Sequence, residues 1–203
     1  MAESMTFNSL VNDIANYCER ADDQWFTDQI PRFIMLAENR ISAESKPLGF
    51  LRVVRGTLSG PVLQKPARWR KTRSLAIKVG SRFSYLQKRS LEFCRTYWPD
   101  ESAQDTPKYY ADYDYEHYFL SPSPSLPLTF ELQYYERPIP LDSSNQANWT
   151  TRYAPQLLLY GALMEAMPAL KTSERIPEFQ GLYDRALMAI TQESLSGDSD
   201  ASS

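Results

Sequence analysis

The sequence predicts an α+β fold in which a helical bundle of about four helices carries a β-rich insertion. Helical periodicity occurs at both ends of the chain, while short alternating segments punctuated by Gly and Pro lie between them. A chain of 203 residues with 42% hydrophobic content is long enough to bury a core. We expect an N-terminal helical pair at 1–47, a β-rich insertion with one short helix at 48–148, a C-terminal helical pair at 149–191 and a flexible tail at 192–203.

The first expected helix covers about residues 7–20, where apolar side chains recur at helical spacing and Thr6 is a suitable N-cap. The second covers about 27–44, with Pro31 in its first turn. Proline is tolerated there because its missing N–H has no helical partner in the first turn.

The insertion contains β-like segments at 50–58, 74–79, 109–112, 115–119 and 128–135, and a short helix near 88–98. Phe130, Leu132 and Tyr134 alternate with polar residues at the period of a strand. Glycines and prolines between these segments predict turns.

Two helices joined by a polar turn are expected between Trp149 and Ile190. Pro155 fits the first turn of the first of them, and the apolar run that follows carries only one charge, at Glu165. A helix that is apolar on nearly all sides must be buried, so other parts of this chain or a neighbouring copy must cover it. The tail after residue 191 is rich in Ser, Asp and Gly and is expected to be disordered.

Several segments, in their order along the chain, resemble the head-to-tail adaptor proteins of tailed bacteriophages. The matching stretches are IPRFIMLAENRI at 30–41, PKYYA at 107–111, ELQYYERPIPL at 131–141, LLLYGALMEAMP at 157–168, the pair Glu174 and Arg175, and FQGLYDRAL at 179–187. Most of these residues are packing residues, so the resemblance rests on their joint order.

The resemblance implies a structural, non-enzymatic protein of the virion. Such adaptors form rings, usually dodecamers, that dock on the portal protein and connect it to a tail or nozzle protein, leaving a channel for the genomic DNA. It further implies ring formation after portal docking. Because the N-terminus carries Glu3 and no long apolar run, we expect assembly in the host cytoplasm.

Charge is unevenly distributed along the chain. Residues 50–98 contain twelve Lys or Arg and one acid, whereas the other 10 bases face 24 acids elsewhere. Opposite charge blocks can pair between identical subunits, or they can neutralise each other within one chain. The residues proposed for a partner or intersubunit interface are Arg68, Trp69, Arg70, Lys71 and Arg73 on the basic side and Asp112, Asp114 and Glu116 on the acidic side.

Nothing in the sequence predicts catalysis or a cofactor. The single histidine, His117, has no nearby Cys and no helical His partner, and neither common glycine-rich phosphate-loop pattern occurs. Cys18 and Cys94 are expected to be free thiols, because two cysteines in apolar helical contexts do not form a disulfide framework. No stretch approaches the ~20 apolar residues that span a bilayer.

The alternative function is that of a basic, β-rich nucleic-acid-binding module. The segment from Arg68 to Arg73 interleaves a tryptophan with bases, a combination that also occurs in proteins that stack nucleic-acid bases on aromatic rings. Trp and Arg are equally typical of protein interfaces, and no known DNA or RNA motif is present. For an adaptor, we expect acidic or polar side chains along the channel, because bound phosphates would slow DNA transit.

Overall fold

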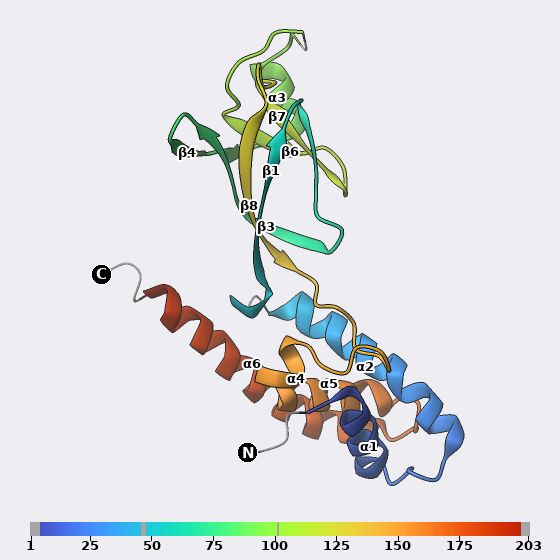
Figure 1. Ribbon diagram of the computed structural model, residues 1–203. Coiled ribbons are helices and arrows are strands. Elements are labelled where there is room, and N and C mark those ends of the chain that lie inside the picture. Colours follow the sequence, from blue (N-terminus) through green and yellow to red (C-terminus); the bar gives the residue numbers. More distant parts are fainter. Residues whose placement is uncertain (1–4, 46–47, 101, 200–203) are drawn as a thin grey trace. The chain divides into compact units, whose positions relative to one another are not determined.

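The computed structural model describes residues 5–45, 48–100 and 102–199. The chain is α+β and divides into two compact units: a helical unit formed by Met1–Phe50 and Pro138–Ser203, and a β unit formed by Leu51–Arg137 (Figure 1). Over the described residues there are six α-helices and two four-stranded sheets.

The helical unit contains all the α-helices described except α3. Its elements are α1 (Phe7–Tyr17), α2 (Gln24–Glu44), the 3-10 turn η1 (Leu48–Phe50), α4 (Trp149–Tyr153), α5 (Pro155–Ala166), the 3-10 turn η2 (Ser173–Arg175) and α6 (Ile176–Ser199). The expected cap of α1 is present, since the Thr6 hydroxyl accepts a hydrogen bond from the Ser9 amide.

Helix α2 begins three residues earlier than its sequence suggests. The Asp23 carboxylate accepts a hydrogen bond from the amide of Phe26 and caps the helix there. Pro31 therefore lies inside α2 rather than in its first turn, so that expectation was wrong. An early aspartate cap outweighed the preference of proline for the first turn.

Helix α5 is the centre of the helical unit. Eight of its twelve residues are buried, and it contacts α1, α2, α4 and α6 (Figure 1). The surrounding helices thus come from this chain itself. A four-helix bundle is not confirmed, because the unit packs five helices with α5 among the others rather than four equivalent helices.

Close packing around α5 depends on a glycine. A Cβ atom added at Gly161 would lie 3.2 Å from the Ala37 Cβ and 3.3 Å from the Tyr183 ring, so even alanine would force its neighbours to move. The two helices facing this position, α2 and α6, are also joined by the Tyr183 hydroxyl, which lies 2.6 Å from the carboxylate of Glu44. Glu165, the one charge of α5, accepts a hydrogen bond of 3.0 Å from Arg40 Nε.

Residues 138–148 group with the helices, although we expected the insertion to extend to residue 148. The buried carboxylate of Glu38 on α2 accepts hydrogen bonds from the Leu141 amide, at 3.1 Å, and from Asn148 Nδ2, at 2.6 Å. Asn148 in turn caps α4. Burial raises the pKa of Glu38, and these two donors partly offset that effect.

The C-terminal segment differs from expectation. Helix α6 continues to Ser199, so residues 192–199 are helical rather than a flexible tail, and residues 200–203 lie outside the described part of the chain. The sequence offers a reason, because no proline interrupts this stretch and Gln192, Glu193 and Leu195 have good helix propensity.

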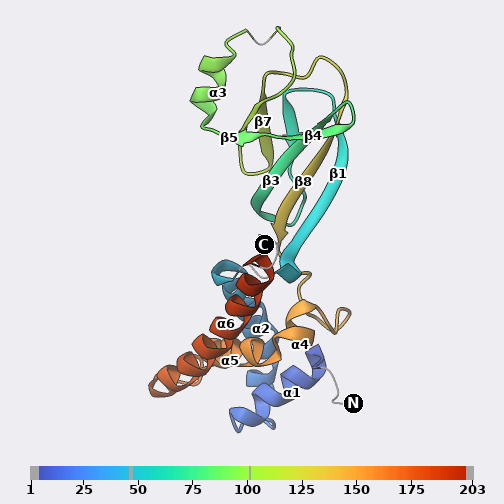
Figure 2. The ribbon, with the colours of Figure 1, turned by 90° about the vertical axis from the view of Figure 1, so that its left-hand side faces the viewer.

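The β unit contains two sheets. In the first sheet the strands follow the order β1 (Leu51–Leu58), β8 (Leu128–Glu136), β3 (Trp69–Val79) and β4 (Arg82–Tyr85). In the second sheet they follow the order β2 (Val62–Gln64), β7 (His117–Ser121), β6 (Tyr109–Asp112) and β5 (Gln87–Lys88). Helix α3 (Leu91–Tyr97) lies beside the second sheet and contacts β6 and β7 (Figure 2). The short strands β2, β4 and β5 were not foreseen, and neither was the start of β3 at Trp69.

The core of the β unit lies between the two sheets. Buried side chains from the first sheet, including Leu75, Ile77 and Leu132, belong to one cluster with Tyr118 and Leu120 from the second. The alternation expected at Phe130, Leu132 and Tyr134 is present, since all three are buried in this cluster.

Leu158→Ala tests the burial of α5. Leu158 is fully buried, so the substitution should lower the free energy of unfolding by about 2–5 kcal/mol, from lost apolar contact and the cavity left behind. Chemical denaturation followed by far-UV circular dichroism measures this loss. Met188→Ala is the control, because Met188 on α6 is 64% exposed and its truncation should change stability by no more than ~0.5 kcal/mol. Equal midpoints for the two variants would contradict the central place of α5.

Candidate partner interface

The eight interface residues predicted from the sequence all lie in the β unit. The basic ones occupy the turn before β3 and the first part of that strand. The acidic ones lie at the end of β6 and in the turn that leads to β7. Within this unit, the folded chain brings Trp69 and Asp112 to the same lysine.

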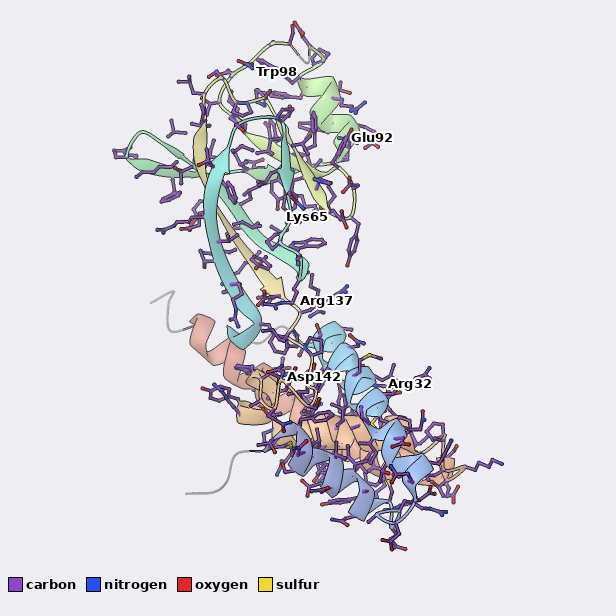
Figure 3. All side chains as sticks on the ribbon, turned by 45° about the vertical axis from the view of Figure 1, so that its right-hand side comes forward. Arg32, Lys65, Glu92, Trp98, Arg137 and Asp142 are labelled. Atoms are coloured by element: carbon purple, nitrogen blue, oxygen red, sulfur yellow. The ribbon has the colours of Figure 1, made fainter. Side chains whose placement is uncertain are left out.

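That lysine is Lys65, whose side chain is only 2% exposed. Its ammonium nitrogen donates hydrogen bonds to Asp112 Oδ1, at 2.8 Å, and to the Asp114 carbonyl oxygen, at 2.9 Å. The same nitrogen lies 4.1 Å from the Trp69 ring centroid and 4.7 Å from that of Tyr118. A buried ammonium needs such partners, since an unpaired charge in a protein interior is strongly unfavourable. Figure 3 labels Lys65 among the side chains of the β unit.

Asp112 binds a second lysine. Its other carboxylate oxygen accepts a hydrogen bond from the exposed Lys88 at 2.5 Å. Partial burial alone would raise the pKa of Asp112, but the hydrogen bonds and positive charges of the two lysines outweigh it and hold the pKa below its ordinary value. Asp112 is therefore already paired within its own chain.

The basic residues of the proposed interface differ in their ion pairs and in their burial. Arg68 donates to Glu136 Oε1 at 2.8 Å, and Arg52 lies 3.2 Å from the other oxygen of the same carboxylate. Partial burial, with a smaller effect of the nearby Arg137 charge, lowers the pKa of Arg70. Lys71 and Arg73 are exposed.

The acidic turn is held by its own backbone. Asp114 Oδ1 accepts hydrogen bonds from the amides of Glu116 and His117, both at 2.7 Å, and its carboxylate lies 2.9 Å from His117 Nδ1. Glu116 is exposed, and its carbonyl oxygen accepts from the Lys65 amide at 2.7 Å. His117 thus has a structural partner.

Trp69 is half-buried rather than free for stacking. Its ring meets the edges of Tyr115 and Tyr118 at centroid distances of 6.0 and 6.3 Å, and its indole N–H donates to the Thr72 hydroxyl at 3.1 Å. Beside it is a hollow of about 210 Å³ lined by residues that include Pro66, Trp69, Tyr115 and Glu116.

The two units carry opposite net charge. Counting the full sequence, the helical unit has sixteen acids and eight bases, a net charge of -8, whereas the β unit has nine acids and fourteen bases, a net charge of +5, which together give the -3 of the chain. The intramolecular pairs around Glu136 and Asp112 reduce the charge of the β unit's basic block only in part.

Lys65, Lys88 and Tyr118 were missed as members of this cluster. The two lysines were counted only as part of the basic block, because no spacing in the sequence distinguishes a buried lysine from an exposed one. The available signal was indirect: a tryptophan four residues after Lys65, and three acids at the end of β6 and in the turn that follows it.

No group of three or more His, Cys, Asp or Glu side chains suited to a metal ion occurs among the residues the structure describes. Within the same ranges, no helix has both the length and the apolar character required to cross a bilayer. Cys18 and Cys94 are free thiols.

Comparison with known families gives a match over nearly the whole chain. A family model described as SU10 adaptor protein matches residues 5–202. No curated protein gives a significant match.

Lys65→Met should destabilise the β unit by about 1–3 kcal/mol, because the Asp114 carbonyl oxygen loses its buried donor. Lys88→Met is the matched control: Lys88 pairs with the same carboxylate but is exposed, so its loss should have an effect below ~1 kcal/mol. Denaturant unfolding followed by tryptophan fluorescence measures both. A larger effect for Lys88→Met would show that the buried lysine is not the main stabilising partner.

Asp112 should make the stability of the β unit depend on pH. Because the folded state lowers the pKa of Asp112, the stabilising effect of its charge is fully present above the ordinary pKa, about 3.9, and is lost as the pH falls through the folded-state value. Asp112→Asn should therefore be less stable than wild type at neutral pH, and the difference should shrink in acid. Denaturation midpoints across this range measure it; a pH-independent difference would contradict the assignment.

Proposed function

Because the chain belongs to the SU10 adaptor protein family, we propose that it is a structural head-to-tail adaptor of a tailed bacteriophage. The family match over residues 5–202 is the observation that carries this proposal. We place the protein in the virion, at the connection between head and tail, after assembly in the host cytoplasm. Its role there is mechanical rather than enzymatic.

The proposed mechanism is assembly around an open channel. Copies associate side by side through heterologous contacts that close into a ring, with a dodecamer expected, and the ring docks on the portal protein and binds a tail or nozzle protein. The genomic DNA passes through the channel. The opposite net charges of the two units support this mechanism, since heterologous contacts join different surfaces of identical subunits.

Within this mechanism the interface consists of Arg68, Trp69, Arg70, Lys71 and Arg73, with Asp112, Asp114 and Glu116 on the acidic side. The exposed Lys71 and Arg73 support a contact with an acidic protein surface. Arg68 and Asp112 contribute through the intramolecular pairs that orient neighbouring side chains. From the sequence, the helices form an N-terminal pair and a C-terminal pair. Packed around the buried α5, they give each subunit a preformed surface, which supports ring formation.

Nucleic-acid binding by the β unit is the second candidate, and its net charge of +5 is the observation in its favour. The half-buried Trp69 weakens it, because Lys65 covers the ring and leaves less of it for a base. Binding to heparin and to single-stranded DNA over a salt series separates the candidates, since a nucleic-acid module loses affinity steeply with salt.

Electron microscopy and native mass spectrometry of the purified chain, with and without portal protein, test the adaptor function. We expect rings bound to portal. A chain that binds DNA tightly and leaves the portal unoccupied would overturn the proposal.

The combined substitution of Lys71→Glu and Arg73→Glu should weaken assembly onto the portal, because it reverses two exposed charges of the proposed interface. Lys108→Glu is the control, an exposed lysine of the same unit that lies outside the basic block. The yield of portal-bound rings measures the effect. Normal assembly combined with altered DNA retention would show that these residues face DNA instead of protein.

A further inference from the structure

Trp25 is unusually exposed for its residue type. It is 60% exposed on the first turn of α2, whereas the other three tryptophans are partly buried. Among the described residues, no other aromatic ring packs against the Trp25 ring. Tryptophan is the residue most enriched at the energetic centre of protein interfaces, so its exposure identifies a candidate contact point.

The surroundings of Trp25 are acidic. Asp22 and Asp23 precede it and Asp28 follows one turn later on α2. The nearest base along the sequence is Arg20, whose guanidinium lies 3.9 Å from the Asp23 carboxylate. Asp22 is exposed. We call Trp25 with these three aspartates the acidic knob.

The β unit contains a pocket of matching chemistry. It encloses about 220 Å³ and is lined by residues that include Val62, Arg95, Trp98, Tyr113, Phe119 and Ser123. We call it the apolar pocket. Trp98 ends α3 and contributes one wall, and Figure 3 labels it. Its volume is below the ~300–1,000 Å³ typical of small-molecule sites, so it fits a single large side chain rather than a cofactor.

The residues that line the apolar pocket favour the binding of an aromatic side chain with acidic neighbours. Tyr113 and Phe119 stack at a centroid distance of 6.0 Å, and Val62 and Tyr113 are each 44% exposed. Arg95 is exposed and makes no ion pair with any described acid. The segment from Lys88 to Trp98 contains three bases and one acid, Glu92, so the positive charge is in excess there.

We propose that the acidic knob of one copy inserts Trp25 into the apolar pocket of the neighbouring copy, with its aspartates facing Arg95. This inference rests on the proposed function, since it names one contact of the ring. It joins a helical unit of net charge -8 to a β unit of net charge +5. Because knob and pocket are different surfaces, the contact is heterologous and can repeat around a ring.

Photo-cross-linking tests the contact directly. Trp25 is replaced by benzoylphenylalanine in the full chain, isotope-labelled and unlabelled copies are mixed, and the mixture is assembled on portal protein. Cross-links should join position 25 of one copy to peptides of another copy that contain Trp98, Tyr113 or Phe119. Intact rings with cross-links elsewhere, within one copy or to the portal would overturn this contact alone, whereas an absence of rings would overturn the ring proposal together with it.

Substitutions give a second readout. Trp25→Ala should weaken subunit association by at least about 30-fold, the loss typical of a central interface tryptophan. Tyr153→Ala is the control, since Tyr153 is 68% exposed in the same unit and should leave association unchanged. Circular dichroism confirms that both variants fold.

A charge exchange then identifies the partner. Asp22→Arg and Arg95→Asp should each weaken association when present in every copy, because like charges meet at the contact. An equal mixture of the two variants should regain the ring yield, since each altered knob then meets an altered pocket and each native knob meets a native one. A mixture no better than the single variants would overturn the pairing.

Discussion

Burial of α5 is the constraint on which the helical unit depends. An isolated helix with this composition would expose apolar side chains on every side, and water disfavours that exposure by about 1.5–3 kcal/mol for each large side chain. This burial is achieved because helices from both the N-terminal and the C-terminal part of the chain surround α5. Packing leaves so little room that Gly161 is needed where α2 and α6 approach.

The β unit depends on a different kind of interaction. Its two sheets share an apolar core, but the turn between β6 and β7 is fastened to the end of β2 by a buried cation. Lys65 satisfies its charge with a carboxylate, a carbonyl oxygen and two aromatic rings. Removing one partner of such a pair is more harmful than replacing the pair altogether, because an uncompensated charge would remain inside the protein.

Periodicity and composition predicted the α+β class, the helices near each end and the longer strands, because these depend on local patterns. They failed where local preferences compete: Pro31 suggested a helix start, but Asp23 caps α2 earlier. Strands of two to four residues, such as β4 and β5, carry too few residues for alternation to be visible. The proposed interface residues all lie in one unit, but the pairing of Asp112 with Lys65 spans 47 positions and has no local signal.

The connectivity of the two units has a consequence for synthesis on the ribosome. The β unit is one continuous stretch, Leu51–Arg137, so it can complete its folding as soon as that stretch has emerged. The helical unit is split, and α1 and α2 are made long before α5. During that interval the apolar sides of α1 and α2 that pack on α5 lack this partner, and a translation product released early would expose them to aggregation.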